Sequence, residues 1–205
     1  MKNILMITAL FILTFSTAAC AANIILPEPD KTGGPSVLEA IANRASAAQE
    51  PFAKQELSMK ELSTVLWAAT GKNREPKGWT VPMAMGREPY VTVYVILKNG
   101  GYIYNWEKNA LIEVIAEKRL ISRAVTQDFA KTAPCLLVLV NRGTMNVEQY
   151  SDIAAGAMAQ NVYLAAEALN LKTRFLASFN KVSLESSLML GPIMKIAGVM
   201  VVGRQ

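Results

Sequence analysis

The sequence predicts a single α+β domain in which helices cover a mixed sheet. Helical and strand patterns alternate along the chain, one pair of strand patterns is joined by a hairpin signal, and no internal repeat is found. The chain has 205 residues, of which 52% are apolar, which is enough for one domain with a substantial core. The folded domain is expected from residue 36 to residue 205.

The first 22 residues are typical of a secretory signal peptide. Lys2 precedes an uncharged run from Ile4 to Ser16, and small residues occupy positions 17–22. This run is too short for a comfortable membrane span. Cleavage after Ala21 would release a soluble protein, whereas processing at Cys20 would attach a lipid. Cleavage without lipid is favoured, because the residue three before the cysteine is threonine rather than the usual leucine. We expect an exported protein, in the periplasm or envelope, that contacts a membrane only if Cys20 is lipidated.

The first half of the domain contains two predicted helices. Prolines and glycines predict an extended lead-in over residues 23–35. A helix should follow, since apolar residues recur at helical spacing on one face: Val37, Leu38, Ile41 and Ala42. The next helix should begin at the capping box Ser58-Met59-Lys60-Glu61, and Gly71 fits a left-handed stop at its end.

The second half alternates strands and helices after an irregular stretch at 72–89. Asn99-Gly100 is a hairpin signal between the strands 91–97 and 102–104. The longest helix should span 147–169, with one broad face at Ile153, Ala157, Gln160, Leu164 and Leu171, and Asn170 can adopt the left-handed cap. The remaining elements are expected as a strand at 111–115, a helix at 117–130, a buried strand at 135–141, a strand at 172–178, a helix at 183–190 and a strand at 196–202.

The composition excludes several classes of chemistry. The chain has no histidine, which rules out a Ser-His-Asp hydrolase and removes the commonest transition-metal ligand. No glycine-rich dinucleotide fingerprint or complete phosphate loop occurs. The net charge is +5 with scattered basic residues, which favours a solvated surface over nucleic-acid binding and suits a small anionic ligand. Cys135 lies in an apolar run and is expected to be a buried strand residue. An enzyme built from this chain would delegate its chemistry to a bound cofactor.

Several segments, in their order and spacing, resemble the nitroreductase family. The strongest is 57–74, LSMKELSTVLWAATGKNR, against the pattern L-S-x-x-E-L-S-x-L-L-W-A-A-x-G-x-N-R. That pattern is typical of the compact branch related to thiazoline-forming, SagB-type oxidases. Further matching segments are Thr80-Val81-Pro82, Gly100-x-Tyr102-x-Tyr104, Ala133-Pro134 and residues 155–171. The resemblance covers about residues 36–203.

The resemblance implies a flavoenzyme with a nitroreductase-like fold. Such proteins bind FMN non-covalently at the interface of an intertwined homodimer. They transfer two electrons between a nicotinamide donor or a substrate and an acceptor, here expected to be a small organic molecule. Because nicotinamide donors are scarce outside the cytoplasm, an exported member could use NAD(P)H or another electron donor.

The family motifs also imply the flavin contacts. Arg44 and Ser46 match the phosphate motif R-x-S-x-[R/K], whereas Ala48 replaces its second cation. The motif P-S-x-x-N-x-Q-P reads Pro82 to Pro89, with Met83, Gly86 and Glu88 replacing the serine, asparagine and glutamine. The expected cofactor contacts are Arg44, Ser46, Arg74, Pro82, Met83, Ala84, Ser178 and Arg204. No catalytic side chain and no metal ligand are assigned. The replacements keep open an alternative, a non-catalytic binding or scaffold protein that has the fold but has lost flavin.

Overall fold

The computed structural model describes residues 23–115, 120–143 and 148–205 of the chain. The predicted signal peptide, including Cys20, lies outside the described residues, as do the first residues of the helices expected from 117 and 147. No helix among the described residues is long and apolar enough to cross a bilayer.

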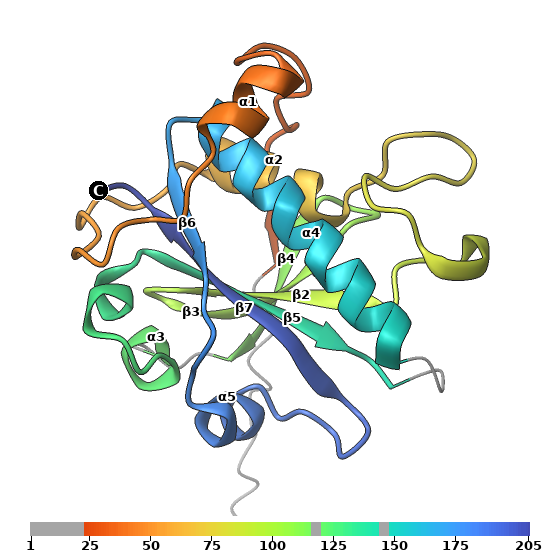
Figure 1. The fold of residues 1–205 in the computed structure, drawn as a ribbon. Coiled ribbons are helices and arrows are strands. Elements are labelled where there is room, and N and C mark those ends of the chain that lie inside the picture. The colour runs from red at the N-terminus through yellow and green to blue at the C-terminus, as the bar shows by residue number, and fades with distance from the viewer. Residues whose placement is uncertain (1–22, 116–119, 144–147) are drawn as a thin grey trace, which may run out of the picture.

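The described strands form one seven-stranded sheet in the order β1-β4-β3-β2-β5-β7-β6 (Figure 1). The strands are β1 (Asn23–Ile25), β2 (Val91–Leu97), β3 (Gly100–Asn105), β4 (Ala110–Ile115), β5 (Cys135–Asn141), β6 (Lys172–Phe175) and β7 (Lys195–Gly203). The central pair β2 and β5 runs in register over its whole length, from Val91 opposite Asn141 to Leu97 opposite Cys135. Because β5 is flanked on both sides, all seven of its residues are buried.

Helices cover both faces of the sheet. The helices are α1 (Val37–Asn43), α2 (Met59–Thr70), α3 (Leu120–Ala124), α4 (Glu148–Ala168) and α5 (Lys181–Ser187), with 3-10 turns η1 (Ala84–Gly86) and η2 (Asp128–Thr132). Side chains of β5 alternate between two apolar clusters. Leu137 and Leu139 pack in the cluster that contains residues of α2 and α4, whereas Leu136 and Val138 pack in the cluster that contains residues of α3 and α5.

The predicted α+β class is confirmed, and the sheet differs from the expected mixed sheet in its pairings. Every pairing between the named strands is antiparallel. Strands β5 and β6 are both antiparallel to β7, so the crossover through α4 joins two parallel strands that do not touch. Among the described residues, parallel pairing occurs only as the isolated bridge between Ser46 and Thr173.

The lead-in and the predicted 117–130 helix differ from the sequence predictions. The lead-in begins with β1, which pairs with β4 at the sheet edge through Asn23 opposite Ile112. The described part of the 117–130 segment is helical only to Ala124, because Val125 is buried and bridges to Phe179. The segment then continues into η2.

The apolar face predicted for α1 points outward, and the face predicted for α4 does so only in part. In α1, Ala40 is buried, whereas the predicted residues Val37, Leu38 and Ile41 are exposed. In α4, Ile153 is 68% exposed. The face that packs on the sheet is built mainly from small residues: Ala154, Ala155, Met158, Ala159, Val162 and Ala166. Of the other residues predicted on this face, Ala157 packs against the core and Leu171 is buried, whereas Gln160 is exposed. Alanines carry little periodic signal, which is why the buried face of α4 was only partly predicted.

Two predicted helix caps are confirmed and one is wrong. Ser58 and Glu61 form the predicted capping box, and Asn170 has the predicted left-handed backbone with φ 54°. Gly71 has φ −72°, so the predicted left-handed stop is wrong. Glycine is required there by space, since a Cβ would lie 2.3 Å from Cδ1 of Trp67.

Candidate functional site

The predicted phosphate contacts Arg44 and Ser46 both contact the side chain of Tyr163. Arg44 follows the last residue of α1, and its guanidinium carbon lies 4.7 Å from the ring centroid of Tyr163 on α4. Ser46 Oγ lies 3.0 Å from the Tyr163 hydroxyl, which also accepts from the backbone N–H of Phe175 at 2.9 Å. Tyr163 therefore positions both residues at the edge of the sheet formed by β6.

The segment after Ser46 lies beside the C-terminus. The backbone N–H of Ala48 donates to Oε1 of Gln205 at 2.9 Å, and Gln205 Nε2 donates back to the Ala48 carbonyl at 3.0 Å. The N–H of Ala53 donates to the carbonyl of Arg204 at 2.7 Å. The structure thus brings the first phosphate motif to the chain end that carries Arg204.

Arg204 forms an ion pair with Glu61 in the first turn of α2. The two side chains are 26% and 19% exposed. One other guanidinium nitrogen of Arg204, Nη1, is buried without a hydrogen-bond partner, and so is Nε of Arg44. Guanidinium N–H groups donate strongly to phosphate oxygens, and buried donors without partners are rare in proteins. The donors present therefore fit a phosphate group, although Glu61 neutralises part of the charge on Arg204.

The second group of predicted flavin contacts lies in the loop between α2 and β2. Arg74 and Pro82 are exposed, whereas Met83 is only 9% exposed and packs in the core cluster of α2 and α4. The N–H of Ala84 lies 3.3 Å from the hydroxyl of Tyr90. Arg74, Pro82 and Met83 line a common pocket of about 240 Å³, to which Arg44 and Arg204 do not contribute.

Gly86 and Glu88, two positions that differ from the family motif, line different pockets. Gly86 lines the same pocket and has φ 61°, a backbone conformation that favours glycine. Glu88 is exposed and lines a separate pocket of about 340 Å³ together with Trp106 and Arg142. Gly86 and Glu88 therefore face two different pockets.

Ser178 does not join either group. Its Oγ accepts from Nε2 of Gln127 at 2.8 Å and lies 3.2 Å from Oγ1 of Thr126. These partners lie between α3 and η2, close to the bridge between Val125 and Phe179. Within one chain the predicted contacts thus fall into three places, as expected if two copies complete a site between them.

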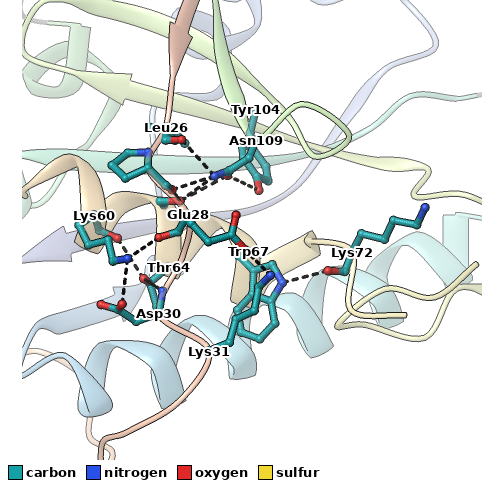
Figure 2. A network of polar contacts seen from close by, with 12 residues as sticks. Leu26, Glu28, Asp30, Lys31, Lys60, Thr64, Trp67, Lys72, Tyr104 and Asn109 are labelled. Atoms are coloured by element: carbon teal, nitrogen blue, oxygen red, sulfur yellow. Dashed lines mark hydrogen bonds and ion pairs between the residues drawn. The ribbon is translucent and has the colours of Figure 1, made fainter. Parts of the chain in front are cut away.

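Residues 26–34 form a strap over α2 that was not predicted from the sequence (Figure 2). Asn109, at the β3–β4 turn with φ 44°, donates from Nδ2 to the carbonyl of Pro27 at 2.9 Å. Lys60 donates to the carbonyl of Glu28 at 2.6 Å and lies 3.0 Å from a carboxylate oxygen of Asp30. The predicted extended lead-in is therefore fixed to both the sheet and α2.

The strap borders a pocket of about 510 Å³ between α2 and α4. Its lining includes Lys31, Gly33, Trp67, Asn73, Thr80, Asn161 and Leu164. The polar groups here are largely satisfied within the chain, since Asn161 Nδ2 donates to the carbonyls of Ala68 at 3.0 Å and Thr80 at 3.1 Å. None of the predicted cofactor contacts lines this pocket.

Cys135 and the metal-ligating side chains do not form a site in the part of the chain that the structure describes. Cys135 is fully buried, and burial raises the pKa of its thiol to about 12, so the reactive thiolate is not populated near neutral pH. The described residues contain no cluster of three or more histidine, cysteine, aspartate or glutamate side chains that could hold a metal.

Comparison with known proteins identifies the family. The nitroreductase family model matches residues 41–204. A nitroreductase homologue of Methanocaldococcus jannaschii is 31% identical over 143 residues, which cover 62% of this chain and 72% of that protein. The crystal structure of a nitroreductase homologue from Ralstonia eutropha JMP134 has a TM-score of 0.81 and 32% identity, and covers 99% of this chain and 95% of that chain.

A more distant structure, from Desulfovibrio desulfuricans, was solved in complex with FMN. It is 20% identical with a TM-score of 0.62, covers 83% of this chain and 86% of that chain, and shows that the fold is shared. The family model matches most of the chain, and the predicted resemblance is confirmed. The chain therefore belongs to the nitroreductase family of oxidoreductases.

Proposed function

We propose that the chain is an exported FMN-dependent oxidoreductase that passes two electrons to or from a small organic substrate. The observation that carries this proposal is the pair of unpartnered guanidinium donors, Nε of Arg44 and Nη1 of Arg204. Both arginines stand where the family motifs place phosphate contacts. Membership of the family and the FMN-bound relative from Desulfovibrio desulfuricans support the choice of cofactor.

Specific residues would hold the cofactor. Arg44 and Arg204 would donate to the phosphate, and the hydroxyl of Ser46 would add a neutral donor. Pro82 and the thioether of Met83 would provide an apolar wall that excludes water from the ring. The bound FMN would supply the two-electron chemistry, while the chain supplies binding and orientation.

A second copy of the chain would complete the site. The outward face of α1 exposes Val37, Leu38 and Ile41, and α4 exposes Ile153. Exposed apolar side chains on helices are typical of surfaces that pack against a partner. A homodimer would bury these residues. It would also bring the predicted phosphate contacts of one copy, Arg44, Ser46 and Arg204, to the loop at 82–84 of the other copy.

Export is proposed from the N-terminal sequence. An uncharged run followed by small residues ends immediately before Asn23, the first residue of β1. Removal of residues 1–22 would leave the whole sheet intact. Mass spectrometry of the protein purified from its native cells would show either cleavage after Ala21 or a lipid on Cys20. Outside the cytoplasm, the electron donor would be NAD(P)H only if it is supplied there, and otherwise a different donor.

An alternative function is favoured by the replaced positions. Ala48 removes a cation, Met83 is part of the core, and Glu61 pairs with Arg204. Each lost contact to a buried ligand group costs about 1–3 kcal/mol. Together these changes suit a non-catalytic binding or scaffold protein that keeps the fold and the dimer without flavin.

Gel filtration after incubation with FMN separates the two functions. The flavoenzyme predicts a flavin absorbance band that co-elutes with a dimer and bleaches when an electron donor is added. An Arg44→Gln variant should elute as the same dimer with much less flavin, and the control Lys98→Gln, at an exposed surface lysine, should retain it. A colourless wild-type dimer that retains no FMN even at high concentration would refute the flavoenzyme and support the scaffold.

A further inference from the structure

Three cationic residues line one small pocket in the loop between α2 and β2. The pocket has a volume of about 240 Å³, and Arg74, Lys77 and Arg87 contribute to it. The other lining residues are Gly78, Trp79, Val81, Pro82, Met83 and Gly86. The lining thus contains cationic and apolar groups and no acidic residue, a combination that attracts anions.

The position of Arg74 depends on a close approach to Gly78. A Cβ at Gly78 would lie 2.8 Å from Cβ of Arg74, 2.9 Å from its Nε and 3.1 Å from its guanidinium carbon. Any larger residue at 78 would displace the Arg74 side chain. The N–H of Asn73 donates to the carbonyl of Gly78 at 3.1 Å, which closes the short segment that carries Arg74. The absence of a Cβ at Gly78 therefore leaves room for the Arg74 side chain to lie close to the backbone beside the pocket.

The charge of Arg74 and Lys77 is not compensated within the described residues. Neither side chain forms an ion pair there, whereas the neighbouring Lys72 pairs with Glu75 at 2.5 Å. Uncompensated positive charge beside an apolar wall is favourable for an anion that leaves bulk water, because the reduced local dielectric strengthens the attraction.

The apolar wall of the pocket contains one unsatisfied donor. Trp79 is 8% exposed, and its Nε1 has no hydrogen-bond partner. Its ring packs edge-on against Trp106, with 5.5 Å between ring centroids and an interplanar angle of 87°. A buried indole N–H without an acceptor is unfavourable, so a ligand oxygen that reached it would be stabilised.

We propose that this pocket recognises the anionic end of the organic substrate, a carboxylate or phosphate group attached to an apolar body. The inference rests on the proposed oxidoreductase function, because Pro82 and Met83 border both the pocket and the expected flavin. A volume of about 240 Å³ is smaller than a typical complete ligand site, so the pocket takes the charged end and leaves the apolar body outside. Arg44 and Arg204 remain for the cofactor phosphate.

Calorimetric titration of the purified protein with benzoate, phenyl phosphate and neutral benzamide tests this inference without turnover. We expect benzamide to bind at least about tenfold more weakly than the preferred anion, and the anion to bind more weakly as salt is raised. Arg74→Gln and Lys77→Gln should each weaken anion binding by about tenfold, the usual effect of removing one charge-assisted hydrogen bond. The matched control Lys72→Gln removes a cation that is outside the pocket and should have no effect. The ratio of benzoate to phenyl phosphate affinity identifies the preferred anion.

Equal binding of benzamide and both anions would overturn the inference, as would anion binding that survives both pocket substitutions or that falls equally in Lys72→Gln. Failure of the proposed function looks different. If the protein binds the anion but retains no FMN, the anion pocket is supported and the proposed oxidoreductase function is refuted. If the protein retains FMN but shows no preference for an anion, the proposed oxidoreductase function is supported and the anion pocket is refuted.

Discussion

Glu61 joins the first turn of α2 to the end of the chain through Arg204. One carboxylate oxygen of Glu61, Oε2, accepts from the N–H of Ser58 at 2.8 Å and from its hydroxyl at 2.9 Å. The other oxygen, Oε1, accepts from Nη2 of Arg204. A single side chain thus caps a helix and fixes an arginine that the family motifs assign to phosphate, while lowering the net charge available to a ligand.

Glu61→Gln should strengthen FMN binding and weaken the fold. The side-chain oxygen of glutamine can still accept from the N–H of Ser58, but glutamine no longer neutralises the charge of Arg204. We expect FMN affinity to rise several-fold and the free energy of unfolding to fall by roughly 1–2 kcal/mol, since the ion pair is partly exposed. Fluorescence titration and urea unfolding measure the two effects. The control Glu185→Gln breaks an exposed pair with Lys181 and should leave FMN affinity unchanged. Weaker FMN binding in Glu61→Gln would contradict the assignment of Arg204.

Leu38→Glu should convert the dimer into a folded monomer. Leu38 is exposed in the first turn of α1, where an acidic side chain is favourable for an isolated helix. In a dimer that covers α1, the same carboxylate would be buried without a partner and would weaken association by about 100-fold or more. Light scattering after gel filtration measures the mass. The control Val182→Glu changes an exposed apolar residue on α5 and should remain dimeric. A Leu38→Glu protein that stays dimeric would place the interface elsewhere.

Asn109→Ala should release the strap while the sheet stays folded. The substitution removes the donor to Pro27 and puts alanine in a left-handed conformation, which together cost about 2–4 kcal/mol. Hydrogen exchange should become faster in the strap, at residues 26–34, and remain unchanged in β5. In the control Asn105→Ala, the same turn loses only the bond from the N–H of Lys108, and the strap should keep its protection. Equal protection of the strap in both variants would show that Asn109 does not anchor it.

Stability should fall as the pH rises above about 9, in part because of Cys135. Burial raises the pKa of its thiol to about 12 from the ordinary 9.0, so between these values the unfolded chain loses a proton that the folded chain keeps. The free energy of unfolding then decreases, by up to about 1.4 kcal/mol per pH unit for one group. Urea unfolding at pH 8.5, 9.5 and 10 should show a shallower decrease in Cys135→Ala than in the wild type. If the free energy of unfolding falls equally with pH in the wild type and in Cys135→Ala, the pKa of the thiol is the same in the folded and unfolded chain, which would contradict the prediction. Burial also raises the pKa of Tyr104, which adds a decrease above pH 10.

Local patterns predicted most of the fold. The strands Val91–Leu97 and Cys135–Asn141 were predicted with their observed ends, because β-branched and apolar residues form continuous runs there. The capping box at Ser58 fixed the start of α2. The inward face of α4 was only partly predicted because it is built mainly from alanines, which pack on the sheet by being small. The reason for Gly71 was missed because it depends on the position of the Trp67 ring rather than on backbone φ.

Only residues that belong to short sequence motifs were predicted for the site, and their distant partners were not. Arg44 and Ser46 follow from a short local pattern, and the structure brings them together. Their common partner Tyr163 is 117 residues from Ser46, and the partner of Arg204 is 143 residues away. No local rule links such positions, because their contact is created by the sheet and by the packing of α2 and α4. The pocket lined by Arg74, Lys77 and Arg87 likewise depends on loop geometry that no periodic pattern encodes.

The most direct test of the account compares FMN with riboflavin, which lacks the phosphate. Dissociation constants for both ligands are measured by fluorescence quenching with the purified wild type and with Arg44→Gln. If Arg44 and Arg204 hold the phosphate, FMN should bind the wild type about 100-fold or more tightly than riboflavin, and Arg44→Gln should remove at least about tenfold of that difference. Equal affinities for FMN and riboflavin, or no binding of either, would contradict a flavin site built on these arginines.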